Sequence, residues 1–118
     1  MSPNEYQKLA LRTESVSNGP LYFEQEDARL LQGLMGLNGE AGEAIDIFKK
    51  YLYQGHPLDR DHLARELGDV AWYLALSAHA LGYSLEDVLE MNIEKLEKRY
   101  PHGYFEAGKS VHRRDGDL

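Results

Sequence analysis

Apolar residues recur at helical spacing through two long stretches of this chain. From about Gln25 to Leu52, one face carries an apolar residue every three or four positions: Leu31, Leu34, Leu37, Ala41, Ala44, Phe48 and Tyr51. A second stripe follows Asp59, a plausible helix cap, and runs to Leu81: Leu63, Leu67, Val70, Leu74, Ala78 and Leu81. This period is typical of amphipathic helices that bury one side. The pattern therefore predicts two long helices joined by a connector at 53–58.

A short helix is predicted at the N-terminal end. Ser2 is placed to cap it, Pro3 takes the first helical position, and Glu5 can reach back to complete a capping box. The segment 15–20 contains turn residues and lacks periodicity. The first helix is therefore expected to end there.

A further helix is predicted after the second long one. Gly82 fits a helix C-terminus, Ser84 offers the next cap, and Pro101 should end the new helix at Tyr100. Residues 107–118 are polar and are expected to form a flexible tail.

Three glycines interrupt the first long helix, at Gly36, Gly39 and Gly42. Each costs about 1 kcal/mol relative to alanine within a helix. We therefore expect them to allow close approach of another helix or a local irregularity.

The whole pattern indicates an all-α fold of antiparallel helices. With 118 residues and 42% hydrophobic residues, the chain fits one domain, 1–118, with a core at about 25–105. The net charge of −7 disfavours a nucleic-acid partner, and the lack of cysteine excludes disulfides. No apolar run is long enough for a membrane span and no signal-peptide pattern begins the chain, so a cytoplasmic protein is expected.

Two acidic signatures carry the candidate chemistry. Glu40 and Glu43 lie three residues apart in the first long helix, and Glu66 and Asp69 repeat that spacing in the second. Residues three apart share a helix face, so four carboxylates converge if these faces meet. Such a cluster favours a bound cation, and an all-oxygen ligand set prefers Mg²⁺, or Mn²⁺, to zinc or copper.

The acidic pairs also have a simpler interpretation, because any one such pair is more often a solvated helix face. Two pairs beside apolar stripes favour a site, since a charge next to an apolar surface is costly unless it has a partner. A ferritin-like di-iron centre is disfavoured, because no glutamate here is followed three residues later by histidine. The histidines, His62 among them, are expected mostly at the surface.

A cationic face is predicted on the helix before Pro101. Asn92, Lys95 and Arg99 follow one another at spacings of three and four, and Lys49 can add a further charge. If this face turns toward the carboxylates, the two together would suit a phosphate chain that bridges metal and protein.

Taken in order, Gly39-Glu-Ala-Gly-Glu43, Glu66-Leu-Gly-Asp69-Val70 and Asn92-x-x-Lys95-x-x-x-Arg99-Tyr-Pro resemble the MazG-type nucleoside triphosphate pyrophosphohydrolases, from about Leu31 to Phe105. The resemblance implies an all-α helical bundle completed by homo-oligomerisation, as a dimer or tetramer. It also implies magnesium-dependent hydrolysis of a ribo- or deoxyribonucleoside triphosphate to the monophosphate and pyrophosphate, by attack of a metal-activated water on the α-phosphorus.

The resemblance assigns roles to individual residues. Glu40, Glu43, Glu66 and Asp69 match the metal ligands, and Glu40 or Glu43 would also orient or deprotonate the attacking water. The phosphates would be held by Asn92, Lys95 and Arg99, with Lys49 a weaker match. The resemblance does not assign the residues that contact the base, for which Tyr6, Gln7, Asn38 and Tyr73 are candidates.

Two non-enzymatic interpretations stay open at this stage. A helical binding or regulatory module would bind nucleotide or a basic partner and release no pyrophosphate. A structural oligomer with a solvated acidic face would gain no stability from magnesium.

Overall fold

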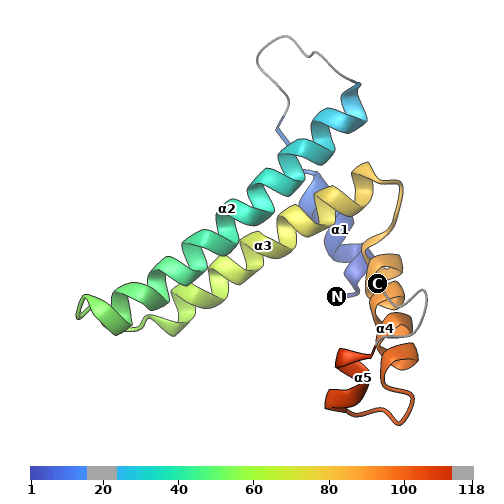
Figure 1. Cartoon of the computed structure of the whole chain (residues 1–118). Helices are drawn as coiled ribbons and strands as arrows, with labels where there is room; N and C mark the ends of the chain where they lie inside the picture. The colour runs from blue at the N-terminus through green and yellow to red at the C-terminus, as the bar shows by residue number, and fades with distance from the viewer. Residues whose placement is uncertain (16–23, 113–118) are drawn as a thin grey trace. The chain divides into compact units, whose positions relative to one another are not determined.

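The computed structural model describes residues 1–15 and 24–112 (Figure 1). Within this part of the chain the elements are all helices, in agreement with the predicted all-α fold: α1 (Pro3–Leu11), α2 (Gln25–Tyr53), α3 (Arg60–Ala80), α4 (Leu85–Arg99) and α5 (Ala107–Val111). The chain divides into two compact units, Met1–Leu85 and Glu86–Leu118. None of the described helices combines the length and apolarity needed to cross a lipid bilayer.

Side-chain caps mark the beginnings of α1 and α3. The predicted capping box of α1 is present: Ser2 Oγ accepts the backbone N–H of Glu5, and Glu5 Oε2 accepts that of Ser2, both at 3.1 Å. At α3, Asp59 Oδ1 accepts the backbone N–H of His62 at 3.0 Å. Each bond satisfies an N–H that has no partner within its helix.

The C-terminus of α3 has a Schellman motif. Gly82 adopts a φ of +85°, and the Tyr83 backbone N–H reaches the Ala78 carbonyl at 2.9 Å. The Gly82 N–H bonds to the His79 carbonyl, also at 2.9 Å. Glycine enters this left-handed conformation without strain, so α3 can end here and α4 can begin at Leu85.

Helix α1 is shorter than predicted. It ends at Leu11, and the N–H groups of Thr13 and Glu14 bond three residues back, to Ala10 and Leu11. Thr13 Oγ1 also donates to the Ala10 carbonyl at 2.9 Å, which competes with continued helical bonding. The predicted end near 15–20 falls largely on 16–20, outside the described residues.

Helices α2 and α3 form a long hairpin and pack side by side (Figure 1). A Cβ at Gly33 would lie 2.3 Å from Ser77 Oγ, and one at Gly36 would overlap the ring of Tyr73. The predicted close approach is therefore confirmed at Gly36 and extends to Gly33.

The other two glycines behave differently. An added Cβ at Gly39 or Gly42 would meet open space. These positions do not support the hairpin contact, so close approach within this chain does not explain them.

Gln7 attaches α1 to the rest of the first unit. Its side chain is buried, with Nε2 donating to the carbonyls of Ala75 (3.1 Å) and Tyr83 (3.3 Å) and Oε1 accepting the Leu85 N–H (3.1 Å). Beside it lies a small core of Ala10, Ala75 and Leu85, against which Tyr6, Trp72 and Leu74 pack. Because Gln7 is occupied in this way, its candidate role in contacting a base is wrong.

Arg29 joins the start of α2 to the segment after α1. Its Nε and Nη2 each lie 2.7 Å from an oxygen of Glu14, a two-point pairing in which both side chains are largely buried. Such forked pairs are stronger and more directional than a single bond. Glu14 is thereby held against the first turns of α2.

The second unit contains α4 and α5. Helix α4 ends at Arg99, before Pro101 as predicted. In the turn that follows, the rings of Tyr100 and Phe105 lie 5.5 Å apart, and His102 Nδ1 lies 2.7 Å from Glu106 Oε1.

The first part of the expected tail is a short helix, α5, whereas residues 113–118 lie outside the described part. Packing of α4 in one bundle with α2 and α3 stays a prediction.

Substitution of Gly33 by alanine tests the hairpin contact. We expect Gly33→Ala to lower the free energy of unfolding by about 1–3 kcal/mol, because the new methyl group overlaps Ser77. Thermal and urea unfolding measure the change. Gly39→Ala is the matched control and should not destabilise, because a Cβ there meets open space, and adding Ser77→Ala should restore part of the loss. Equal stability of Gly33→Ala and Gly39→Ala would contradict the close packing.

Candidate metal centre

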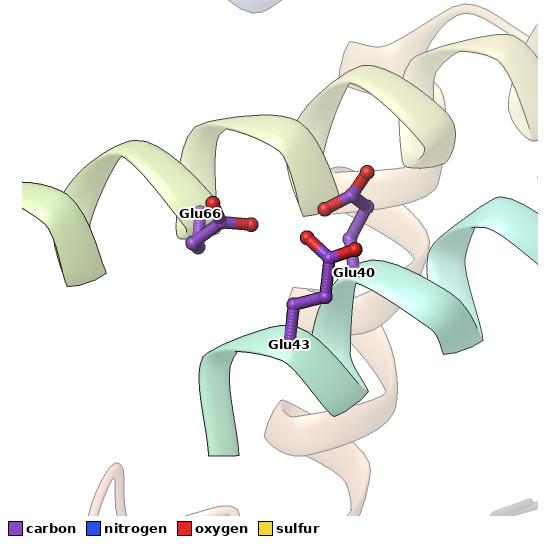
Figure 2. A group of neighbouring side chains, drawn as sticks. All are labelled: Glu40, Glu43 and Glu66. Carbon is purple, nitrogen blue, oxygen red and sulfur yellow. The ribbon is translucent and has the colours of Figure 1, made fainter. Parts of the chain in front are cut away.

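Packing of α2 on α3 brings three glutamates together. Glu40 and Glu43 project from α2 and Glu66 projects from α3 toward them (Figure 2). One carboxylate oxygen from each lies within 4.8 Å of the others. The predicted convergence of the two acidic pairs is therefore present for these three side chains.

Asp69, the fourth predicted ligand, lies one turn beyond Glu66. It is exposed and falls outside the three-glutamate group, but it borders the same open cavity as Glu40. Its charge also contributes to the electrostatics of Glu40. The residue is therefore placed at the edge of the cluster.

The cluster contains carboxylate oxygens that lack partners. One oxygen of Glu40 and one of Glu66 are shielded from solvent and have no hydrogen-bond partner among the described residues. An unpaired buried charge is costly, and a divalent cation is the natural partner for converging carboxylates. The donor set is all oxygen, so it fits a hard ion such as Mg²⁺ or Mn²⁺.

Proximity changes the acidity of Glu40. Partial burial of its carboxyl group, contacts with Glu66 and Glu43, and the charges of Glu43 and Asp69 together raise the pKa of Glu40 to about 7. Each of these effects disfavours the ionised form. In the absence of metal, Glu40 therefore carries a proton over part of the neutral range.

His62 is a neighbour of the cluster that the sequence analysis assigned to the surface. It is exposed, but its Nε2 lies 3.4 Å from Glu66 Oε1, one helical turn away. The signal was the spacing of four residues to Glu66, which places two side chains on one helix face.

A cavity of about 380 Å³ adjoins the carboxylates. It is open to solvent and lies within the first unit. Both Glu40 and Asp69 line it, and five more residues complete the lining: Thr13, Ser15, Gln32, Trp72 and Tyr73. Of these five, Tyr73 is the one that the sequence analysis names, as a candidate for contacting the base.

The predicted phosphate ligands come from both units of the chain. Lys49 Nζ pairs with Asp46 Oδ1 at 2.9 Å, two turns beyond Glu43 on α2. Asn92, Lys95 and Arg99 lie on α4, whose residues from Glu86 onward belong to the second unit. Their approach to the carboxylates stays a prediction.

An all-α protein in which a helical hairpin holds converging carboxylates has the arrangement of a divalent-metal centre. The sequence profile of the MazG nucleotide pyrophosphohydrolase domain matches residues 26–104, which include both acidic pairs and α4. The chain belongs to this family.

Two curated proteins are similar to this chain. The Gene 37 protein of Mycobacterium phage L5 is 36% identical over 101 residues, which cover 79% of this chain and 89% of the phage protein. The uncharacterized protein YvdC of Bacillus subtilis (strain 168) is 44% identical over 43 residues, or 36% of this chain and 41% of that protein. No solved structure matches.

The raised pKa of Glu40 predicts a stability that depends on pH. The folded chain retains a proton that the unfolded chain releases between pH 4.5 and about 7, so this stabilisation is lost as pH rises through about 7. The melting temperatures of the wild type and Glu40→Gln are compared with chelator present. As the pH is raised from mildly acidic to mildly alkaline, the melting temperature of the wild type should fall relative to that of Glu40→Gln. Glu94→Gln, an exposed control on α4, should follow the wild type. If the melting temperatures of wild type and Glu40→Gln change with pH in parallel, the raised pKa of Glu40 is contradicted.

Proposed function

We propose that this centre hydrolyses a nucleoside triphosphate to the monophosphate and pyrophosphate in the presence of Mg²⁺. The observation that supports it most is the convergence of Glu40, Glu43 and Glu66 with carboxylate oxygens that lack partners. Membership of a nucleotide pyrophosphohydrolase family supports the reaction class.

The ion would be held by Glu40, Glu43, Glu66 and Asp69. When bound, a divalent cation supplies a Lewis acid that polarises phosphoryl oxygens and increases the acidity of water. Mn²⁺ satisfies the same all-oxygen ligand set and should substitute.

Glu40 or Glu43 orients the attacking water and accepts its proton. A bond forms between the water oxygen and the α-phosphorus, the bond to the bridging oxygen of the β-phosphate breaks, and pyrophosphate leaves. Both side chains come from one face of α2, so a water between them has an acceptor on either side. Glu66 limits their movement from across the hairpin.

Negative charge on the phosphates needs cations from the protein. Asn92, Lys95 and Arg99 supply a donor and two charges over two turns of α4, with Lys95 the main contact. Lys49 is the weaker contact, because Asp46 already pairs with it. Fixed cations stabilise the charge that spreads over the transferred group.

The enzyme acts as a homo-oligomer, a dimer or tetramer. An apolar face of α2 is exposed in the single chain, with Ile45 64% exposed, and it includes Leu34, Met35, Ile45, Phe48 and Leu52. Ala41 and Gly42 interrupt this face with small residues, where another helix can approach closely. Large exposed apolar patches of this kind mark association surfaces.

The catalytic proposal is tested by release of pyrophosphate from each common ribo- and deoxyribonucleoside triphosphate, with Mg²⁺ or with chelator. We expect metal-dependent release by the wild type and at least a hundredfold loss in Glu43→Gln and Glu66→Gln, because both remove a ligand charge. Asp27→Asn, an exposed position of α2, is the matched control and should keep activity.

Stability supplies the second readout of the same variants. Magnesium at a hundredfold excess over its dissociation constant should stabilise the wild type by about 2.7 kcal/mol and Glu66→Gln by much less. Nucleotide binding without pyrophosphate release at any metal concentration would favour a regulatory module. No stabilisation by Mg²⁺ would indicate a solvated acidic face.

The association proposal is tested with Ile45→Asp. A charge in the middle of the apolar face should shift the assembly toward monomers, as measured by light scattering coupled to gel filtration. Glu24→Asp, at the exposed cap of α2, should leave the mass unchanged. A monomeric wild type would rule out the oligomer.

A further inference from the structure

The cavity beside the carboxylates extends along α2 away from the metal ligands. Glu40 borders it, and so does Gln32, eight residues earlier on the same helix and about 12 Å away along its axis. An extended nucleotide spans a similar length from its α-phosphate to the far edge of its base. The volume, about 380 Å³, is adequate for a nucleoside.

Two polar groups of the lining, those of Trp72 and Thr13, are already occupied. Trp72 Nε1 donates to the Ala10 carbonyl (3.0 Å) and to Thr13 Oγ1 (2.9 Å), and that hydroxyl itself donates to Ala10. Trp72 therefore offers its apolar ring surface to a ligand, and Thr13 offers its methyl group and one remaining acceptor position. The side chains of Gln32 and Ser15 are the polar pair at this end.

Gln32 and Ser15 bind each other in a way that leaves donors and an acceptor for a ligand. Gln32 Nε2 donates to Ser15 Oγ at 3.0 Å. With respect to the described residues 1–15 and 24–112, one hydrogen on Nε2, the Oε1 acceptor and the Ser15 hydroxyl hydrogen remain for a further partner. The bond to Ser15 orients the amide, so the order of its donor and acceptor is set before a ligand arrives.

The ion pair next to this amide makes the arrangement rigid. Glu14 precedes Ser15 and is held by Arg29, and Arg29 lies one helical turn before Gln32. The pairs Glu14 with Arg29 and Ser15 with Gln32 thus form two successive links between the same two segments. Rigid placement of a recognising group lowers the entropy lost on binding.

We propose that Gln32, oriented by Ser15, is the residue that selects the base of the nucleotide, with the base lying against Trp72 and Tyr73. The inference rests on the proposed function, because it places the α-phosphate at the carboxylates. An amide presents one donor beside one acceptor. Proteins commonly recognise a flipped-out base by hydrogen bonds to its Watson–Crick edge.

Replacing the amide of Gln32 by a carboxylate gives a directional test. The introduced carboxylate would present acceptors alone, and guanine offers two adjacent donors, N1–H and the N2 amino group. We therefore expect Gln32→Glu to raise the ratio of kcat/KM for guanine nucleotides over the other bases by roughly tenfold or more. Gln32→Ala should reduce the differences in kcat/KM among nucleotides with different bases, mainly through changes in KM.

The matched control is Gln25→Glu, which adds the same charge at an exposed position of α2 outside the cavity. It should keep the base profile of the wild type. Base profiles of Gln32→Glu and Gln32→Ala that coincide with that of the wild type would overturn the proposal and leave pyrophosphate hydrolysis intact.

Trp72 is the single tryptophan, so its fluorescence reports occupancy of the cavity independently of turnover. Wild type and variants are titrated with the four nucleoside monophosphates. One outcome is that the wild type hydrolyses no triphosphate while its fluorescence responses depend on the base and differ in the Gln32 variants. In that case the proposal of hydrolysis fails and the proposal of base selection stands. If neither hydrolysis nor any fluorescence response is found, both proposals fail.

Discussion

The close contact between α2 and α3 is the constraint on which the rest of the first unit depends. Gly33 lies against Ser77 and Gly36 lies against Tyr73, so the two helix axes can approach where any side chain would separate them. That approach holds Glu66 beside Glu40 and Glu43 in spite of their mutual repulsion. Packing thus keeps like charges together, and it raises the pKa of Glu40, first through partial burial of its carboxyl group, then through its contacts with Glu66 and Glu43, and last through the neighbouring charges.

Features that depend on neighbours in sequence could be predicted from the chain alone. The caps at Ser2 and Asp59 and the glycine at the end of α3 use bonds within a few residues, so residue type and spacing determine them. The convergence of Glu40, Glu43 and Glu66 was also predictable, because the spacing of three assigns a face and a short connector makes the two helices adjacent.

Features that depend on distant partners could not be predicted in this way. Gln7 bonds to Ala75, sixty-eight positions away, and its apparent freedom to contact a base was therefore misjudged. Gly33 drew no attention although it is more confined than Gly39 or Gly42, because a glycine looks the same in sequence whether it faces a helix or open space. The role that we propose for Gln32 could not be predicted for the same reason, because it is argued from the bond to Ser15 and from the cavity, not from a motif.

The cavity lies along α2 with the carboxylates at one end and Gln32 at the other, separated by about two turns of helix. If the nucleoside lies as we propose, a substitution near the start of α2 or after α1 changes its side of the cavity without moving an acidic side chain. The chemical step and the substrate preference can consequently change independently of each other among proteins that share this fold. Two proteins with the same acidic signature are expected to share a chemical step while they consume different members of the nucleotide pool.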